Sequence, residues 1–504
     1  MELKKNVLAN YLGQGWRVLM SVAFIPLFIK YLGIEAYGLI GIFFMLQAWL
    51  GLLDMGMRPA LGREMARLTG GGLRVQFIWD LLRTIEFIGI ALAVVIAVGI
   101  WASSNWFAVY WVTANNLPVD VVTRAFAVMG IVIALSFIES IYVGCIVGLQ
   151  RQVLLSAVAS IMATLRGLGA VGVLAWVSPS IEAFFIWQGV ISFVSAAIFA
   201  GLVYRLLPTS SGRACFSRAA LIGIWRFAAG MMLITLLSLL LHQVDKVLLS
   251  RLLTLEVFGY YVLAGVMVGA VYTLGGPIAT AFFPRFTELA TRGDEHALCT
   301  TYHLGAQLVT VFLGSAAIVL MIFGDRVLLL WTSDQVLTSH VAPLVVVLAL
   351  GALLQGLMWM PFHLQIAHGW TTLTIKISSV AVAVLVPTIL WIVPVHGAIG
   401  AACAWMILSA GYLPLFIHLM HQRLLPTEKW RWYREDIGIP LFAATATAGL
   451  CRWLMPEDQG RFGEFCVLLA SSGCVLIMAA LAAPLVRNQL TRYTPGRIGQ
   501  SMRG

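Results

Sequence analysis

The chain has 504 residues, of which 61% are hydrophobic and only 11% are charged, and its formal net charge is +10. A soluble protein carries roughly a quarter charged residues because water must solvate its surface. The composition therefore excludes a water-soluble globular protein, and the distribution of Lys and Arg described below attributes the positive charge to membrane topology rather than to nucleic-acid binding.

Long apolar segments follow one another along the chain, each of about the 20 residues that a membrane-spanning helix needs. They lack the period-2 alternation of barrel strands, so they are helices. The first follows Lys4 and Lys5 but is too long for a signal peptide, and no small-residue cleavage site follows it. We predict an all-α membrane protein with about fourteen spans near 7–30, 37–57, 77–102, 120–148, 153–177, 181–206, 220–249, 255–283, 301–323, 337–360, 371–393, 397–420, 437–455 and 463–486.

The basic residues orient these spans. If the N-terminus is cytoplasmic, the cytoplasmic connections hold 20 of the 32 Lys and Arg residues and the outer connections hold 6. Cytoplasmic loops of membrane proteins carry such an excess, so both termini are predicted to be cytoplasmic and the number of spans to be even. The segment 426–436 interleaves Trp430, Trp432 and Tyr433 with basic residues, which predicts an anchor at the membrane interface.

An internal repeat divides the chain. The stretch KYLGIEAYG at 30–38 matches RLLTLEVFG at 251–259, 221 residues further on, with the cation, Leu, Glu, aromatic residue and Gly in register. Six predicted helices separate the copies, so both face the same side of the membrane, as in parallel repeats about an axis along its normal. We predict two six-helix lobes at 1–207 and 218–424, two additional helices within 437–486, and a cytoplasmic tail at 487–504.

Several segments resemble the polysaccharide-exporter (Wzx-type) flippases of the multidrug/oligosaccharidyl-lipid/polysaccharide exporter superfamily. They are NYLGQGWRVLM, FIPLFIKYLGIEAYGL and LLDMGMRPALGREMARLTGG in the first lobe, and HQVDKVLLSRLLTLEVFGYYVLA, PFHLQIAHGWTTLTIKIS and HGAIGAACAW in the second. The resemblance implies fourteen spans in a V-shaped pair of lobes that opens alternately to either side. It also implies a bacterial inner-membrane protein whose cargo is an undecaprenyl-pyrophosphate-linked oligosaccharide. Multidrug antiporters and lipid II flippases are relatives.

Charged residues inside the spans are functional candidates, because an idle charge in hydrocarbon costs about 2.5–3.5 kcal/mol on insertion scales and cations hold a pyrophosphate best. Arg17 lies halfway along the first span. It is predicted to contact the pyrophosphate or an acidic sugar, or alternatively to form a purely structural ion pair. The candidate acidic partners are Glu86, Asp54 and Glu139, and the other candidate cavity cations are Arg166, Arg226 and Lys376. Lys376 can instead snorkel to the headgroups.

The seventh span carries His242, Asp245 and Lys246 within about one turn of one another. A carboxylate among such groups can take up a proton or a sodium ion and couple it to transport; the alternative is a charge cluster at the headgroups. Arg58 and Arg63 are placed at the cytoplasmic mouth, where they either attract the anionic head group or only obey the positive-inside rule.

No catalytic site is predicted. The run Gly167-Leu-Gly169-Ala-Val-Gly172 spells a dinucleotide-binding motif but lies within a span, so close helix packing explains it better, as it does the pairs Gly144/Gly148 and Gly265/Gly269. The seven cysteines form no C-x-x-C, and neither H-E-x-x-H nor a Walker loop occurs. We expect no enzyme, metal or cofactor, apart from coupling to a proton or sodium gradient.

Three functions remain. The favoured one is a flippase for surface polysaccharides such as O-antigen, with membrane lipids, a polysaccharide polymerase and other assembly proteins as partners and no nucleic acid. A cation-coupled multidrug antiporter is the second, and the intramembrane cations at least match the acids in number, which favours an anionic cargo instead. A membrane glycosyltransferase or polymerase is the third, disfavoured because the outer loops are short.

Overall fold

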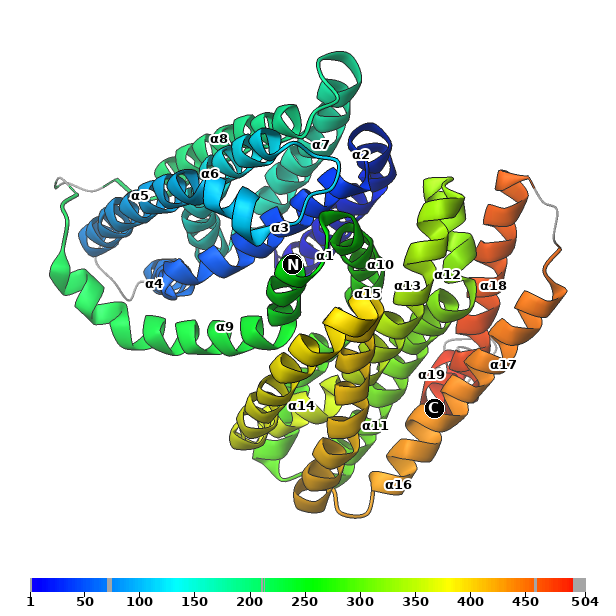
Figure 1. Cartoon of the computed structure of the whole chain (residues 1–504). Coiled ribbons are helices and arrows are strands. Elements are labelled where there is room, and N and C mark those ends of the chain that lie inside the picture. The colour runs from blue at the N-terminus through cyan, green and yellow to red at the C-terminus, as the bar shows by residue number, and fades with distance from the viewer. Residues whose placement is uncertain (1, 70–74, 210–211, 213, 457–459, 493–504) are drawn as a thin grey trace. The chain divides into compact units, whose positions relative to one another are not determined.

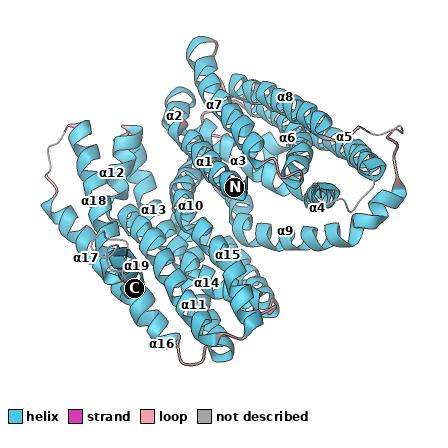
Figure 2. Ribbon diagram, turned by 180° about the vertical axis from the view of Figure 1, so that it is seen from behind, coloured by secondary structure: helices cyan, strands magenta, loops and turns pink. Residues whose placement is uncertain are grey.

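The computed structural model describes residues 2–69, 75–209, 212, 214–456 and 460–492. These residues form helices and no strand beyond one isolated bridge between Thr113 and Thr254 (Figure 2). The all-α prediction is therefore confirmed.

The chain forms two compact units, Met1–Gly259 (unit 1) and Tyr260–Gly504 (unit 2). Figure 1 labels their α-helices. Unit 1 contains α1 (Glu2–Ala23), α2 (Ile25–Leu32), α3 (Ile34–Leu50), the 3₁₀ turn η1 (Gly51–Asp54), α4 (Met57–Thr69), α5 (Val75–Trp106), the π-helical turn η2 (Phe107–Trp111), α6 (Val119–Gly148), α7 (Gln152–Trp176), α8 (Ile181–Leu206), α9 (Arg218–Leu252) and the start of α10 (Leu255–Arg292). Unit 2 contains the rest of α10, α11 (Glu295–Val309), the π-helical turn η3 (Thr310–Gly314), α12 (Ser315–Thr332), α13 (Gln335–Leu357), α14 (Trp359–Ala367), α15 (Thr372–Leu424), α16 (Lys429–Arg431), the π-helical turn η4 (Trp432–Gly438), α17 (Ile439–Leu454), α18 (Arg461–Ala482) and α19 (Pro484–Arg492).

Twelve helical segments in the described part of the chain are long and apolar enough to cross a membrane. One of them, α15, contains two of the predicted spans. A kink at Gly397, with φ 58° and ψ −146°, separates the two. The predicted seventh span falls on α9, which is not among the twelve. Each predicted span thus coincides with helix, while the count of fourteen stays a prediction.

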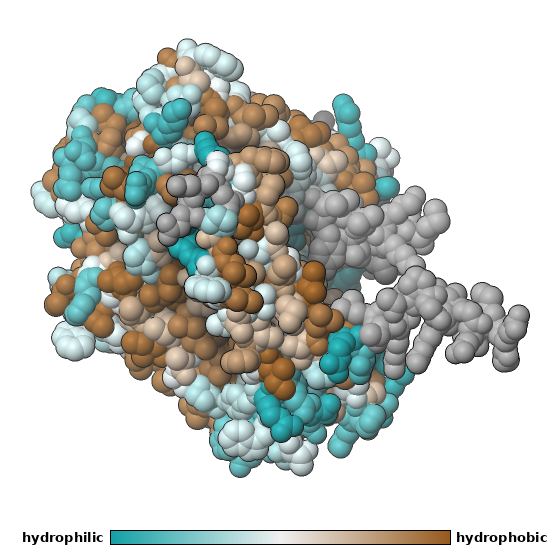
Figure 3. Space-filling model, turned by 90° about the vertical axis from the view of Figure 1, so that its right-hand side faces the viewer, coloured by the Kyte–Doolittle hydropathy of each residue, from teal (hydrophilic) through white to brown (hydrophobic). Residues whose placement is uncertain are grey.

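Many large apolar side chains are exposed on the surface. Large apolar residues such as Trp176, Trp453 and Phe462 are at least 80% exposed. Figure 3 shows broad hydrophobic areas across one face, with hydrophilic side chains gathered mainly toward its margins. A water-soluble protein rarely exposes so much apolar surface, which agrees with a multi-pass membrane protein.

The compact units divide the chain differently from the predicted lobes. Unit 1 continues past 207 and includes α9, because α9 packs against α3, α4 and α5. In unit 2, the two additional helices α17 and α18 pack on each other and on α12 around Phe323 and Val475. The predicted boundaries at 207, 218, 424 and 437 stay predictions, and residues 493–504 of the predicted tail lie outside the described residues.

The two copies of the sequence repeat contact each other within unit 1. A Cβ built on Gly38 would collide with the carbonyl oxygen of Leu255, and one built on Gly259 would lie 2.5 Å from the carbonyl oxygen of Ile34. Leu255 and Gly259 are the repeat counterparts of Ile34 and Gly38, so the contact is reciprocal, as it is across a two-fold axis. Only glycine allows the two backbones to approach so closely, which explains why the repeat ends in glycine in both copies.

Two glycine pairs behave differently. Gly144 and Gly148 of α6 pack against α4, since a Cβ on Gly148 would collide with the carbonyl oxygen of Gly62. That packing interpretation is confirmed. A Cβ on Gly265 or Gly269 would have no neighbour within 4 Å among the described residues, so close packing at this pair was a wrong prediction.

The predicted interfacial anchor at 426–436 is only partly exposed. Trp430 is 74% exposed, whereas Trp432 is fully buried in the hydrophobic core of unit 2. The π-helical turn η4, which begins at Trp432, packs against α11 and α17. The anchor prediction therefore fails for Trp432, and the segment is instead packed into unit 2 by its tryptophan.

Candidate functional site

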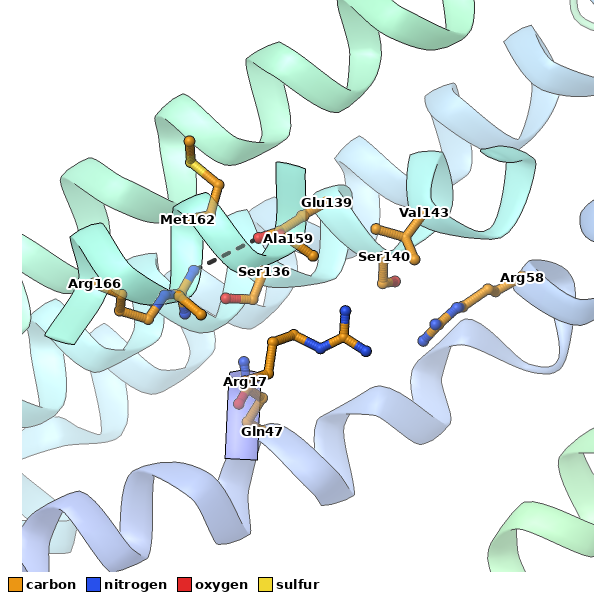
Figure 4. Close-up of a pocket in the computed structure, with 11 residues that line it drawn as sticks. Arg17, Gln47, Arg58, Ser136, Glu139, Ser140, Val143, Ala159, Met162 and Arg166 are labelled. Atoms are coloured by element: carbon orange, nitrogen blue, oxygen red, sulfur yellow. Dashed lines mark ion pairs between the residues drawn. The ribbon is translucent and has the colours of Figure 1, made fainter. Parts of the chain in front are cut away.

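A polar cavity of about 330 Å³ lies within unit 1, between α1, α3, α4, α6 and α7 (Figure 4). Its polar lining residues are Arg17, Gln47, Arg58, Ser136, Glu139, Ser140 and Arg166. The volume falls in the range of about 300–1,000 Å³ found for small-ligand pockets. Polar groups from five helices thus converge on one space.

The cavity is positively charged. Among the lining residues that the structure describes, three arginines face one carboxylate, a formal charge of 3 − 1 = +2. Glu139 Oε2 lies 3.8 Å from Arg166 Nη2, and Glu139 Oε1 accepts a hydrogen bond of 2.7 Å from Ser195. In the described part of the chain no ion pair includes the side chains of Arg17 or Arg58, which extend toward each other (Figure 4).

Close packing of α1 on α7 positions Arg17. A Cβ on Gly13 would lie 2.7 Å from the Cβ of Ser156, and the indole of Trp16 donates a hydrogen bond of 2.9 Å to the hydroxyl of Thr164. Arg17 follows Gly13 by about one helical turn, so these two contacts hold the backbone beneath its guanidinium.

The glycine run 167–172 lies in α7 and allows close packing of that helix. Gly167 and Gly169 make room for the rings of Phe24 and Trp187, both of which would collide with an added Cβ. The indole of Trp187 also donates to the carbonyl oxygen of Leu165 at 3.2 Å. The run is therefore a packing element of α7, next to Arg166, as the sequence interpretation had it.

A capped turn positions Arg58. Both carboxylate oxygens of Asp54 accept the backbone N–H of Arg58, at 3.0 and 3.1 Å, which stabilises the start of α4. Met55 and Gly56 between them have positive φ angles of 47° and 74°, and Gly56 approaches the carbonyl oxygen of Ala228. Asp54 is thus a helix cap, and the predicted alternative of an Arg17–Asp54 ion pair is not observed.

Glu86 likewise has other partners. It is buried in α5 and accepts hydrogen bonds from the hydroxyls of Tyr142 (3.0 Å) and Tyr204 (2.6 Å) and from Arg83 (3.1 Å). It does not line the cavity. Of the three candidate acidic partners, only Glu139 lies at the cavity, and it pairs with Arg166 rather than with Arg17.

The remaining predicted residues lie elsewhere. Lys376 is exposed on α15 in unit 2. Lys246 donates to the side chain of Gln243 at 2.9 Å in α9, where Asp245 is half-buried. Arg63 lies on α4 but does not line the cavity. The side chains of Arg226 and His242 lie outside the described residues.

The sequence interpretation missed Gln47, Ser136 and Ser140 in the cavity. Ser136, Glu139 and Ser140 are spaced i, i+3, i+4 on α6, and side chains with that spacing share one helix face. A polar stripe in an otherwise apolar span was the signal that could have found the two serines.

Comparison with known proteins places the chain in a family. The sequence profile of polysaccharide biosynthesis proteins matches residues 3–290, which include every residue that lines the cavity. The chain belongs to this family. No curated protein sequence matches it significantly.

Solved structures show the same fold. The lipid II flippase MurJ in an inward closed conformation has 11% identity and a TM-score of 0.69, with 96% of this chain and 99% of that chain covered. An inward-facing multidrug resistance MATE family transporter of the MOP superfamily has 14% identity and a TM-score of 0.65, with 82% and 96% covered. A MOP superfamily transporter from Pyrococcus furiosus Vc1 (DSM3638), titled for the reverse polarity of its binding pocket, has 13% identity and a TM-score of 0.55, with 84% and 95% covered. Together with the family match, these structures confirm the resemblance seen in the sequence, and the chain shares the fold of the matched proteins.

Proposed function

We propose that this protein is a flippase for an undecaprenyl-pyrophosphate-linked oligosaccharide. It moves this lipid by alternating access from the cytoplasmic to the periplasmic leaflet of a bacterial inner membrane, for synthesis of a surface polysaccharide such as O-antigen. The observation that carries the proposal is the convergence of Arg17, Arg58 and Arg166 on one cavity whose described lining residues include a single carboxylate. Guanidinium groups bind phosphate oxygens bidentately, and only the pyrophosphate and the glycan of such a cargo need a polar path.

The arginines differ in what they can offer an anion. Arg166 forms an ion pair with Glu139 and donates a hydrogen bond of 3.3 Å to the hydroxyl of Ser192, so its guanidinium is already held in place. Arg17 and Arg58 face each other without a carboxylate between them, so an anion bound there would relieve their mutual repulsion. Gln47, Ser136 and Ser140 add neutral hydrogen-bonding groups for phosphate or sugar oxygens.

The leaflet distribution of undecaprenyl-linked glycan tests this function. In cells depleted of the protein, the lipid-linked glycan is expected to accumulate in the cytoplasmic leaflet, and a wild-type copy is expected to restore export. If depletion causes no accumulation, the flippase assignment is wrong.

Glu139 separates the flippase from the multidrug antiporter. In the flippase, Glu139→Gln raises the formal charge of the cavity from +2 to +3, so the affinity for a polyprenyl pyrophosphate is expected to rise severalfold. In an antiporter of cationic drugs, the same change would remove the one acid among the described lining residues and abolish drug efflux. Binding of a short-chain polyprenyl pyrophosphate and efflux of a cationic dye, measured on the same variant, decide between them. Ser140→Ala, which changes a lining residue without changing charge, is the control.

An ion gradient is the proposed energy source, since the sequence contains no Walker loop for ATP. We place the coupling on α9, where His242, Asp245 and Lys246 follow one another within about a turn. Asp245→Asn is expected to remove the dependence of transport on a proton or sodium gradient in proteoliposomes. Unchanged gradient dependence would exclude Asp245 as the coupling residue and leave the flippase assignment untouched.

A further inference from the structure

A second polar cluster lies in unit 2, where the segment 426–436 packs against α11. Cys299 and His303 are one turn apart on α11, Glu428 precedes α16, and Asp436 lies in η4. The side chains of His303 and Asp436 are completely buried. Burying an ionisable group costs free energy unless the group is paired or binds a metal. The contacts within this cluster therefore decide between an ion-pair network and a metal site.

The imidazole of His303 lies between two carboxylates. Its Nδ1 is 2.5 Å from Asp436 Oδ2 and its Nε2 is 3.0 Å from Glu428 Oε2. The second oxygen of Asp436 accepts a hydrogen bond of 2.9 Å from the side chain of Gln307. A neutral imidazole has one N–H and one lone pair. With the N–H at Asp436, the lone pair of Nε2 faces the lone pairs of Glu428, an arrangement that a cation between them would stabilise.

We propose that Cys299, His303 and Glu428 form a zinc site. Their ligand atoms, Sγ, Nε2 and a carboxylate oxygen, all lie within 4.8 Å of one another. Around tetrahedral zinc, bonds of about 2.0–2.2 Å place a nitrogen and an oxygen ligand about 3.4 Å apart, slightly more than the 3.0 Å between His303 Nε2 and Glu428 Oε2. A thiolate ligand favours zinc over magnesium or calcium. Cys299 and Glu428 are partly exposed, so water can fill the fourth position.

Asp436 acts as a positioning residue. Metal-bound histidines commonly donate their other N–H to a carboxylate, which fixes the tautomer and the ring orientation. Asp436 does this for His303, and Gln307 in turn holds Asp436. The sequence predicted no metal here, because Glu428 and Asp436 are 125 and 133 residues away from His303 and no local motif joins them.

The position of Arg431 is compatible with a zinc ion at this site. Arg431 Nη1 is 3.5 Å from Glu428 Oε2, but its Nε is 3.2 Å from Glu435 Oε2. Arg431 therefore keeps a carboxylate partner when Glu428 binds zinc. The charges of Zn²⁺, Arg431 and Arg434 sum to +4, and those of the Cys299 thiolate, Glu428, Asp436 and Glu435, which pairs with both arginines, sum to −4. In this arrangement zinc cross-links α11 to the segment 426–436, which precedes α17 and α18.

Metal binding by the purified full-length chain tests the site directly. The protein carries a purification tag without histidine, is stripped with a chelator, and is then given Zn²⁺ or Co²⁺ alone. We expect one zinc per chain by elemental analysis and, with Co²⁺, a thiolate-to-cobalt charge-transfer absorption. Cys299→Ser should lose that absorption, whereas Cys403→Ser, at another partly buried cysteine of unit 2, should keep it. Absence of stoichiometric metal, or absorption that survives in Cys299→Ser, overturns the proposal.

Asp436→Asn separates a zinc site from a simple ion-pair network. It leaves all three ligands in place and is expected to weaken zinc affinity by about 10- to 100-fold. Zinc should raise the thermal unfolding temperature of the wild-type protein but not that of Cys299→Ser, while the metal-free unfolding curves show whether each variant folds. If zinc stabilises neither protein, the cluster holds no metal. These readouts do not depend on transport, so they stand or fall separately from the flippase assignment.

Discussion

Replacing Arg17 with alanine is expected to weaken binding of a polyprenyl pyrophosphate by about 10- to 150-fold. This range corresponds to one hydrogen-bonded charged group, about 1.5–3 kcal/mol. Arg17 lines the cavity, and the described ion pairs do not include it. Its removal therefore breaks no ion pair there, and the thermal unfolding temperature should stay close to that of the wild type. Binding is measured by native mass spectrometry or fluorescence competition, and export by the leaflet assay.

Two further variants define the role of Arg17. Arg17→Lys keeps the charge but loses the planar fork, so its affinity should fall between those of the wild type and Arg17→Ala. Arg124→Ala is the matched control, because Arg124 pairs with Asp120 and Glu182 outside the cavity, and it should bind like the wild type. Full export by Arg17→Lys would exclude bidentate recognition. Wild-type affinity of Arg17→Ala would discard Arg17 and keep the flippase.

From the sequence, Arg17 could be identified as a charged residue in the middle of a span, but the residues around it could not be predicted. Three acids were open as partners, and each has a different environment: Glu86 accepts from two tyrosines, Asp54 caps α4, and Glu139 pairs with Arg166. The cap at Asp54 is a local contact, but the environments of Glu86 and Glu139 follow from which helices touch, and α1 meets α7 through Gly13 and Ser156. Contacts between residues more than a hundred positions apart leave no local pattern in a single sequence.

Which face of each helix packs against the protein and which faces lipid also could not be predicted from the sequence. In a soluble protein, a polar stripe marks the outside of a helix, but in a membrane protein both lipid and core are apolar. Span positions could therefore be predicted from hydropathy, whereas the burial of Trp432 and the open surroundings of Gly265 could not. Hydropathy could not assign Arg58 to this cavity either, because the turn that brings it there depends on the backbone at Met55 and Gly56.

Gly38→Ala and Gly259→Ala are each expected to destabilise the protein by about 1–3 kcal/mol, the usual cost of overpacking. In both cases the new methyl group would meet a backbone carbonyl, that of Leu255 or of Ile34, which cannot rotate away as a side chain can. Gly201→Ala on α8 is the matched control, since a Cβ there meets nothing within 4 Å. That change should leave stability equal or raise it by up to about 1 kcal/mol, because alanine favours helix. Thermal unfolding of the purified variants measures all three.

The reciprocal contact makes a second prediction about the pair. Because both methyl groups enter the same interface, the first substitution must separate the two backbones, and the second then meets less resistance. Contacting residues are typically non-additive by about 0.5–3 kcal/mol. The double variant Gly38→Ala/Gly259→Ala should therefore lose less stability than the sum of the two single variants. Strict additivity would mean that the two glycines act at separate contacts, and the repeated motifs would then not form one two-fold contact.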